Sequence, residues 1–337
     1  MQAWQINGSF SVDGLQLNQV AASEPGPGEV VVKVKAVSLN FRDLLVVKGL
    51  YSKKVPQPLT ICSDAAGEVS AVGSGVTRVK LGDRVAGIFM QSWIAGEPNE
   101  AKAKSAMGAF FQGVLADEVK LHEDGLVTVP GHLSDEEAAT LPCAAVTAWN
   151  ALFTQGRLQA GESVLVQGSG GVSIFALQFA AAAGARVIAT SSSDAKLERM
   201  QSMGAHHTVN YVTQPDWEEF ARKATGGRGV DHIVEIGGPA TIGKSIRAAR
   251  MGGSIYLIGN RAEGAADVNL TAALMKSVRI QGVFVGSREM FEAMNRAIEL
   301  HRIRPAVDRV FSMEEGREAL RYFESGQHFG KVVIRVC

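Results

Sequence analysis

Residues 163–193 read SVLVQGSGGVSIFALQFAAAAGARVIATSSS, and this stretch decides the fold of the chain. A short β-branched run at 164–166 ends in a cluster of glycines, and the segment after it carries apolar residues at helical spacing. Gly184 marks the expected end of that helix, and residues 186–190 have the pattern of a second strand. Strand, glycine turn, helix and strand within about 30 residues form the unit that binds dinucleotides in α/β proteins.

The glycines themselves predict a cofactor site. Glycine lets backbone N–H groups approach a pyrophosphate closely, and the phosphate then lies at the positive end of the helix. We therefore expect a dinucleotide to contact Gly168, Gly170, Gly171 and Val172. Ser173 replaces the third glycine of the pattern GxGxxG, and its side chain is small enough for close packing of helix on strand. Glycine clusters also form ordinary turns, but the flanking strands favour the cofactor site.

The residues after the second predicted strand indicate which dinucleotide is bound. Sites selective for NAD usually carry an acidic residue about 20 residues after the glycines, where it holds a ribose hydroxyl. This region of the chain instead has serines and nearby cations, namely Ser191, Ser192, Ser193, Lys196 and Arg199. Hydroxyls and cations suit a 2′-phosphate, so we expect NADPH rather than NADH. A simpler interpretation, compatible with the first, is that Ser193 or Asp194 caps the next helix.

Composition argues against several classes of protein. The chain has 337 residues, with 34 Lys and Arg against 34 Asp and Glu, so its net charge is zero and no basic patch suggests a nucleic acid partner. The N-terminus lacks the pattern of a signal peptide. The longest apolar region, 164–190, is broken by glycines and Arg186, which argues against a membrane span. The three cysteines have no paired spacing, so we expect a reducing compartment, by default the cytoplasm.

The pattern of predicted secondary structure changes near residue 134. Before it, alternating runs such as EVVVKVKAVSLN at 29–40 predict short strands of a barrel or sandwich, and 91–112 has the character of a long surface loop. After it, strand-like and helical runs alternate, which predicts a parallel sheet with helices on both faces. We expect His206 and His207 in a helix-to-strand loop. The final strand, at 331–336, is expected to return to the first domain.

Several segments then resemble those of one family, the medium-chain dehydrogenase/reductases. They are GEVVVKVKAVSLNFRDLLVVKGLY at 28–51, AAGEVSAVGSGVTRVKLGDRV at 65–85, LPCAAVTAWNAL at 141–152, the cofactor unit, and HFGKVVI at 328–334. The resemblance covers essentially the whole chain and is strongest to the zinc-free quinone oxidoreductase branch. It implies a GroES-like β-barrel catalytic domain from residues 1–135 and 287–337, a doubly wound Rossmann domain from 136–286, and a cleft that holds the cofactor.

The resemblance also implies that no metal is bound. Zinc enzymes of the family bind catalytic zinc with a cysteine, a histidine and a second cysteine, whose places are taken here by Asn40, Asp64 and Cys143. An amide, a carboxylate and one thiol make a poor tetrahedral zinc site. Residues 91–112 contain no cysteine, so the structural zinc lobe is also absent from the sequence. Cys143 is interpreted as a buried, inert thiol.

Without zinc, the plausible chemistry changes. Zinc stabilises the negative charge that develops on oxygen during carbonyl reduction, so a metal-free enzyme favours an acceptor that spreads its own charge, such as a quinone or an α,β-unsaturated carbonyl. By resemblance, Asn40 and Tyr51 are the candidate catalytic residues. Tyr51 would donate a proton or polarise an oxygen, and Asn40 would orient the substrate or the nicotinamide. The simpler alternatives place Tyr51 on a surface turn and make Asn40 a helix cap.

Further cofactor contacts are implied by position within the family pattern. They are Thr147, Tyr211, Gly237, Gly238, Gly259, Asn260, Val285, Gly286 and Lys331. Any one of these glycines could belong to an ordinary turn, so the whole group is stronger evidence for a cofactor site than any single residue. Asp43 is interpreted as a structural residue or one that supports the site.

The leading hypothesis is an NADPH-dependent oxidoreductase that transfers hydride to a quinone or enone, with protonation from solvent or Tyr51. One alternative is an alcohol or aldehyde dehydrogenase in which Asp64, Cys143 and a water hold a metal. Another is a nucleotide-binding protein without turnover. The resemblance also implies a homodimer joined through the last Rossmann strand, at 279–285.

Overall fold

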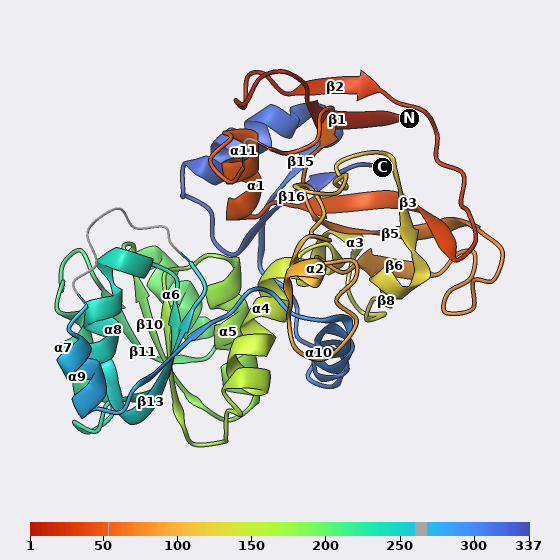
Figure 1. Ribbon diagram of the computed structural model, residues 1–337. Coiled ribbons are helices and arrows are strands. Elements are labelled where there is room, and N and C mark those ends of the chain that lie inside the picture. The colour runs from red at the N-terminus through yellow and green to blue at the C-terminus, as the bar shows by residue number, and fades with distance from the viewer. Residues whose placement is uncertain (53, 260–267) are drawn as a thin grey trace. The chain divides into compact units, whose positions relative to one another are not determined.

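The computed structural model of the chain describes residues 1–52, 54–259 and 268–337. These residues form two compact units, which are described separately below (Figure 1). Unit 1 comprises Met1–Val146 and Gly286–Cys337, and unit 2 comprises Thr147–Val285. Among the described residues, none of the helices combines the length and the apolar character that crossing a bilayer requires.

Unit 2 is built on a six-stranded parallel sheet with the strand order β11-β10-β9-β12-β13-β14. This is the doubly wound order of dinucleotide-binding folds, as the sequence predicts. The strands are β9 (Ser163–Gln167), β10 (Arg186–Ser191), β11 (Ala205–Asn210), β12 (Val230–Glu235), β13 (Ala249–Leu257) and β14 (Arg279–Gly282). The expectation for His206 and His207 was wrong, because both lie within β11 rather than in a loop before it.

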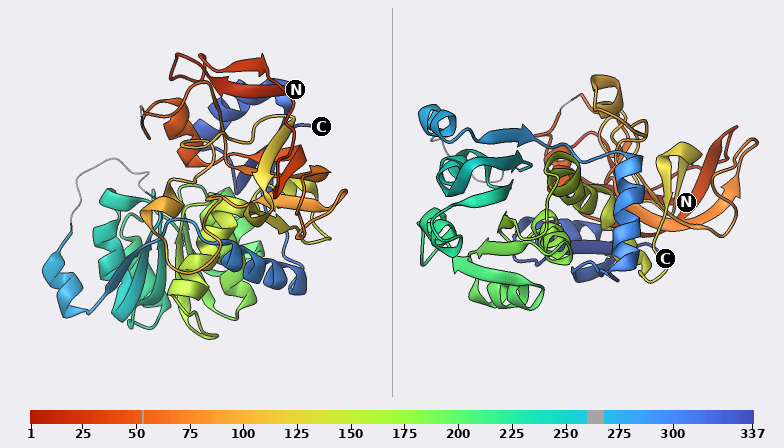
Figure 2. Two further views of the ribbon diagram at one scale, coloured as in Figure 1. Left: turned by 45° about the vertical axis from the view of Figure 1, so that its right-hand side comes forward. Right: turned by 90° about the horizontal axis from the view of Figure 1, so that it is seen from below.

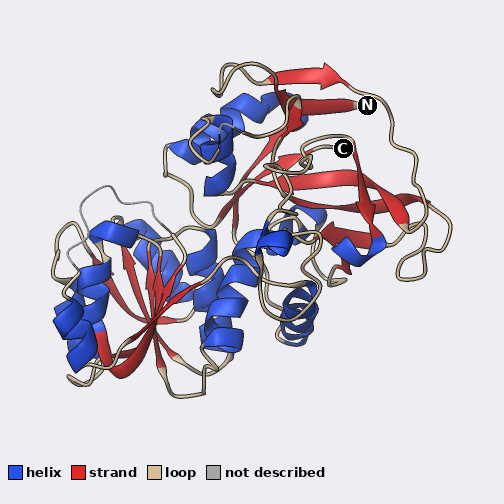
Figure 3. Ribbon diagram, in the orientation of Figure 1, coloured by secondary structure: helices blue, strands red, loops and turns tan. Residues whose placement is uncertain are grey.

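Helices cover both faces of this sheet, seen from one side in Figure 3 and from two others in Figure 2. They are α5 (Gly171–Ala182), α6 (Asp194–Ser202), α7 (Trp217–Ala224), η4 (Gly238–Ala240), α8 (Ile242–Ala248) and α9 (Leu270–Met275). The central strand β9 is apolar throughout its middle because it is covered on both sides: Val164, Leu165 and Val166 are fully buried. A continuous helical run, η2 (Leu141–Ala145), α4 (Val146–Trp149) and η3 (Asn150–Gln155), links the two units in sequence.

Unit 1 is mostly β. Its main sheet has the order β15-β16-β3-β5-β6-β8, with β7 also paired to β3, and a second sheet has the order β2-β1-β4. The strands are β1 (Gln2–Ile6), β2 (Gln16–Gln19), β3 (Glu29–Ser38), β4 (Leu59–Thr60), β5 (Asp64–Val72), β6 (Arg84–Gly87), β7 (Glu118–His122), β8 (Leu126–Thr128), β15 (Val307–Ser312) and β16 (Lys331–Arg335). As expected from the sequence, the C-terminal strand β16 returns to this unit, where it pairs with β3.

Short helices surround the sheets of unit 1. They are α1 (Phe41–Val47), α2 (Glu100–Ala103), η1 (Glu123–Gly125), α3 (Asp135–Ala138), α10 (Arg288–Leu300), η5 (Met313–Glu315) and α11 (Gly316–Glu324). Ser134 and Glu137 form a capping box at the start of α3. Residues 91–112 are irregular, as expected, but they are more than a surface loop, because Trp93 and Met107 are buried.

A buried carboxylate ties the amino ends of two central strands in unit 2. Asp231 of β12 accepts hydrogen bonds from the backbone N–H of Ser163 at 2.9 Å and from its hydroxyl at 2.7 Å. The guanidinium groups of Arg228 and Arg250 also contact it. Although burial alone would raise its pKa, Ser163 and the two arginines outweigh that effect and hold the pKa of Asp231 well below its ordinary value.

We predict that Asp231→Asn lowers the free energy of unfolding by about 2–3 kcal/mol at neutral pH, because two arginines lose their partner. The folded-state pKa lies below the unfolded value of about 3.9, so the carboxylate stabilises the fold above that pH and less as pH falls toward the folded pKa. In urea denaturation, the difference in free energy of unfolding between wild type and variant should therefore be smaller at about pH 3 than at neutral pH. Asp216→Asn, which changes an exposed aspartate of the same unit, is the control and should have little effect at either pH.

Candidate functional site

The glycine turn of unit 2 joins β9 to α5. Gly168 has a φ of +68°, which favours glycine over any residue with a side chain. Gly170 occupies the N-cap position of α5 and has no side chain to accept a bond from the first helical turn. The N–H groups of that turn therefore suit an anion such as a pyrophosphate. Gly171 and Val172 are the first two residues of the helix.

Ser173 has a specific role at the position of the missing third glycine. Its hydroxyl is buried and donates to the carbonyl oxygen of Gln167 at 2.6 Å. The serine therefore ties the first turn of α5 to the last residue of β9. The residue that replaces the third glycine of GxGxxG thus still allows close packing of helix on strand and adds a hydrogen bond between them.

The end of β12 is organised by a second buried carboxylate, which the sequence analysis missed. Glu235 accepts hydrogen bonds from the N–H groups of Gly237 and Gly238, at 2.9 and 3.0 Å, and from the hydroxyl of Thr241 at 2.5 Å. The side-chain amide of Gln167 also donates to it at 2.8 Å. This network explains why the turn holds its shape. A Cβ on Gly237 would lie 2.2 Å from the Thr241 hydroxyl, so this glycine is required by packing within the protein.

The serines after β10 and the aromatic after β11 come together at the carboxyl ends of their strands. The backbone N–H of Tyr211 donates to the carbonyl of Ser191 at 3.0 Å, and the ring of Tyr211 is exposed. Ser192 is exposed and Ser191 is buried. Ser193 is the N-cap of α6, with its hydroxyl accepting from the N–H of Lys196. The simpler interpretation, that Ser193 caps the next helix, is thus correct. Ser191, Ser192 and Tyr211 lie beside it at the carboxyl ends of β10 and β11.

The remaining predicted cofactor residues of unit 2 differ in what surrounds them. Val285 has a φ of +56°, which is rare for a β-branched residue, and its carbonyl accepts from the Asn150 side chain at 2.7 Å. Strained backbone of this kind often accompanies function. Gly259 packs against backbone, because a Cβ there would lie 2.2 Å from the Ile236 oxygen. Thr147 is buried within α4. Asn260 lies outside the described residues.

In unit 1 the predicted residues Asn40 and Lys331 are direct partners. The ammonium nitrogen Nζ of Lys331 lies 2.5 Å from Oδ1 of Asn40 and 2.6 Å from the carbonyl oxygen of Leu39. Both side chains are buried, with 3% of Lys331 and 7% of Asn40 exposed. Gly286, on the same unit, packs against Val146, whose Cγ1 would lie 2.6 Å from an added Cβ.

The register of the sheet brings Asp64, which the sequence analysis considered as a metal ligand, close to Asn40 and Lys331. Ser38, at the end of β3, pairs with Val333 of β16 and with Asp64 of β5. Asp64 is fully buried, and its two carboxylate oxygens accept from the hydroxyl of Ser63 at 2.7 Å and from the backbone N–H of Cys143 at 2.9 Å. Burial raises the pKa of Asp64, while Lys331, Ser63 and the Asn40 amide oppose the rise.

The start of α1 adds two more charged groups to this cluster. Asp43 is buried and accepts from the backbone N–H of Asn40 at 2.8 Å, so Asn40 is the N-cap of α1 as its simpler interpretation proposed. Arg42 donates to the Met107 carbonyl at 2.6 Å and to Asp43 at 3.3 Å. Burial raises the pKa of Asp43, and Arg42 is the largest opposing influence. We call Asn40, Arg42, Asp43, Asp64 and Lys331 the charged cluster; it combines two buried carboxyl groups with two basic side chains.

Tyr51 lies next to this cluster on an aromatic face. Its ring centroid is 6.2 Å from that of Phe110, and the Arg42 guanidinium carbon is 5.9 Å from the Tyr51 ring. The same guanidinium lies 4.4 Å from the ring of Phe89. Tyr51 is half-buried against the core of unit 1, so it is packed on one side and not simply part of an exposed turn.

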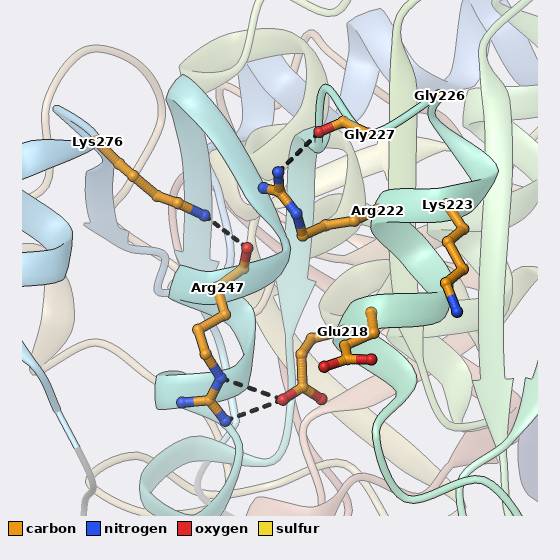
Figure 4. A pocket seen from close by; sticks show the side chains of 8 residues that line it. Glu218, Arg222, Lys223, Gly226, Gly227, Arg247 and Lys276 are labelled. Atoms are coloured by element: carbon orange, nitrogen blue, oxygen red, sulfur yellow. Dashed lines mark hydrogen bonds and ion pairs between the residues drawn. The ribbon is translucent and has the colours of Figure 1, made fainter.

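One cavity of unit 2 is unrelated to these residues. It has a volume of about 770 Å³ and is lined by Glu218, Glu219, Arg222, Lys223, Gly226, Gly227, Arg247 and Lys276 (Figure 4). Gly227 precedes β12 and Lys276 precedes β14, so the cavity lies at the amino ends of the strands, whereas the glycine turn follows the carboxyl end of β9. Its charges are also largely paired: Arg247 binds Glu218, and Lys276 donates to three backbone carbonyls.

Comparison with known proteins found relatives of this chain. Residues 26–131 match the family model described as the alcohol dehydrogenase GroES-like domain, and residues 171–299 match the one described as zinc-binding dehydrogenase. A zinc-type alcohol dehydrogenase-like protein of Schizosaccharomyces pombe is 45% identical over 92% of this chain and 91% of its own length. Quinone oxidoreductase of Rattus norvegicus is 28% identical over 94% of this chain and 92% of its own length. The solved structure of an NAD-dependent alcohol dehydrogenase superposes with a TM-score of 0.92 at 34% identity and covers all of both chains.

The charged cluster does not fit the zinc ion that the second description names. Oδ1 of Asn40 is bound to the cation Lys331, and both oxygens of Asp64 already accept hydrogen bonds. Burial raises the pKa of the Cys143 thiol, and Asp64 raises it further, so the thiolate that zinc requires is disfavoured. No group of three or more His, Cys, Asp or Glu within residues 1–52, 54–259 and 268–337 is arranged to hold a metal.

Proposed function

The chain belongs to the medium-chain dehydrogenase/reductase superfamily and is an oxidoreductase, and we propose that it uses NADPH to reduce a quinone or an α,β-unsaturated carbonyl without a metal. One observation carries this proposal: of the positions that the resemblance assigns to zinc ligands, Asn40 has its amide oxygen bound to Lys331, and Asp64 has both carboxyl oxygens bound to protein donors.

The substrate class follows from that arrangement. An isolated aldehyde develops a full alkoxide charge when it accepts hydride, and a metal normally stabilises that charge by several kcal/mol. In a quinone or enone the charge is spread over the conjugated system, so hydrogen-bond donors are sufficient. When bound, NADPH supplies the hydride. In this proposal the amide of Asn40 orients the acceptor's oxygen, and Tyr51 or solvent supplies the proton.

The proposal is tested by steady-state oxidation of NADPH with a panel of quinones, enones and simple aldehydes. We expect kcat/KM for the conjugated acceptors to exceed that for matched saturated aldehydes by about 100-fold or more. Equal or faster reduction of the aldehydes would favour an ordinary alcohol or aldehyde dehydrogenase. Saturable NADPH binding with no turnover of any acceptor would favour a nucleotide-binding protein without catalysis.

The choice of NADPH rests on the carboxyl ends of β10 and β11. Ser192 is exposed there, and Tyr211 is held beside Ser191 by a backbone hydrogen bond. Lys196 lies in the first turn of α6, next to the N-cap Ser193. Hydroxyls and a cation recognise a 2′-phosphate, and no acidic side chain of β10 is present to bind a free 2′-hydroxyl.

We predict that Lys196→Glu raises the Kd for NADPH by about tenfold or more, equivalent to about 1.4 kcal/mol, because a carboxylate repels the 2′-phosphate. The Kd for NADH, which lacks this phosphate, should change by less than about threefold. Fluorescence titration of both nucleotides measures the two values. Lys223→Glu, the same charge change on α7, is the matched control. An equal loss of affinity for NADPH and NADH in Lys196→Glu would contradict the assignment.

We further propose that the protein is a cytoplasmic homodimer joined through β14. This edge strand is parallel to β13 on one side only and exposes Ile280, and Phe284 follows it at the surface. An exposed apolar strand edge is suited to pairing with another strand. Sedimentation at micromolar concentration should give a dimer. A monomer under those conditions would contradict this part of the proposal.

A further inference from the structure

The orientation of the Asn40 side chain is set by an internal cation. An ammonium group has three N–H donors and no acceptor. Nζ of Lys331, at 2.5 Å from the amide, therefore requires the oxygen Oδ1 to face it. The amide nitrogen Nδ2 must then point away from Lys331. For most asparagines the assignment of O and N rests on the surrounding network; here the contact with Lys331 requires the oxygen at this end of the amide.

Both ends of this contact are held by the backbone. The N–H of Leu39 donates to the carbonyl of Val332 at 3.0 Å, so the residues next to Asn40 and Lys331 belong to one sheet ladder. The carbonyl of Leu39 accepts a second bond from Nζ at 2.6 Å. On the other side, the backbone N–H of Asn40 is fixed by Asp43 at the start of α1. Only the side-chain torsions of Asn40 remain to be set.

The nitrogen of that amide is buried but incompletely bonded. Nδ2 lies close enough to Asp64 to lower the pKa of its carboxyl, yet it makes no hydrogen bond of regular geometry within the described residues. An amide nitrogen has two N–H groups, so even a contact with Asp64 leaves one without an acceptor. Buried donors are rarely left unpaired. A donor of this kind is an observation that points to a ligand atom, such as a substrate oxygen.

We propose that Lys331 is a positioning residue, which holds Oδ1 of Asn40 so that an unpaired N–H of Nδ2 faces the acceptor's oxygen. This inference rests on the proposed function, because Asn40 is the group that would touch the substrate. The sequence-based expectation that Lys331 contacts the cofactor stays a separate prediction. In this proposal the Lys331 ammonium lies beside Asn40, a position that the resemblance assigns to a zinc ligand, and it orients a neutral donor instead of binding the substrate oxygen itself.

A double-mutant cycle separates this role from simple charge balance. The variants are Lys331→Met, which keeps a stem of similar length without the ammonium, Asn40→Ala, and the two combined. Lys331→Met should lower kcat for quinone or enone reduction by about 10- to 100-fold, because the amide loses its fixed orientation. The KM for NADPH should stay within about twofold in all variants. In the Asn40→Ala background, Lys331→Met should cause no further loss of kcat, because its effect passes through Asn40.

Two additional variants keep the test decisive. Lys331→Gln, for use if Lys331→Met does not fold, retains a side-chain donor but no longer dictates which end of the amide faces it; we expect an intermediate loss of kcat. Lys120→Met removes a surface cation of the same unit that pairs with Glu29 and should leave kcat unchanged. Equal losses of kcat from the Lys331 change in both backgrounds would overturn the positioning role. A wild-type enzyme that reduces none of the acceptors would instead overturn the proposed function.

Discussion

The contact between the Lys331 ammonium and Oδ1 of Asn40 is the interaction on which the rest of the candidate site depends. It places a basic side chain beside the buried carboxyl groups of Asp43 and Asp64, which would otherwise be costly to ionise. It also determines which end of the Asn40 amide is available to a ligand. Because Arg42 and Lys331 already lie beside the two carboxyl groups, they would repel a divalent metal there. The chemistry proposed for the chain follows from this one arrangement.

In unit 2, too, buried polar and charged side chains hold the backbone of the predicted site. Its cofactor-type turn is shaped by bonds that the protein makes with itself: Ser173 closes α5 onto β9, and Glu235 gathers the N–H groups at the end of β12. The glycines are explained by backbone conformation and close packing, as at Gly168 and Gly237. In both units, buried charged or polar side chains hold the backbone of the predicted ligand-binding segments.

The sequence predicted the Rossmann sheet well because its signals are local. Strand, glycine turn and helix lie within one short stretch, and the alternation of strand-like and helical runs after residue 134 predicted the parallel sheet. The charged cluster could not be predicted in the same way. Lys331 and Asn40 are 291 positions apart, and they meet only because β16 pairs with β3 in one particular register. Arg42 and Glu235 were missed for the same reason, although a charge inside an apolar run such as SLNFRDLLVV was an available signal. The error at His206 and His207 was one of boundary, since β11 begins before them.

The most direct test of this account is the zinc content of the purified protein after equilibrium dialysis against zinc, with NADPH-dependent turnover measured on the same sample. The account predicts well below one zinc per chain, and a rate of quinone or enone reduction that a chelator does not change. One tightly bound zinc per chain whose removal abolishes turnover would contradict it, because the position assigned to the lysine would then belong to the metal.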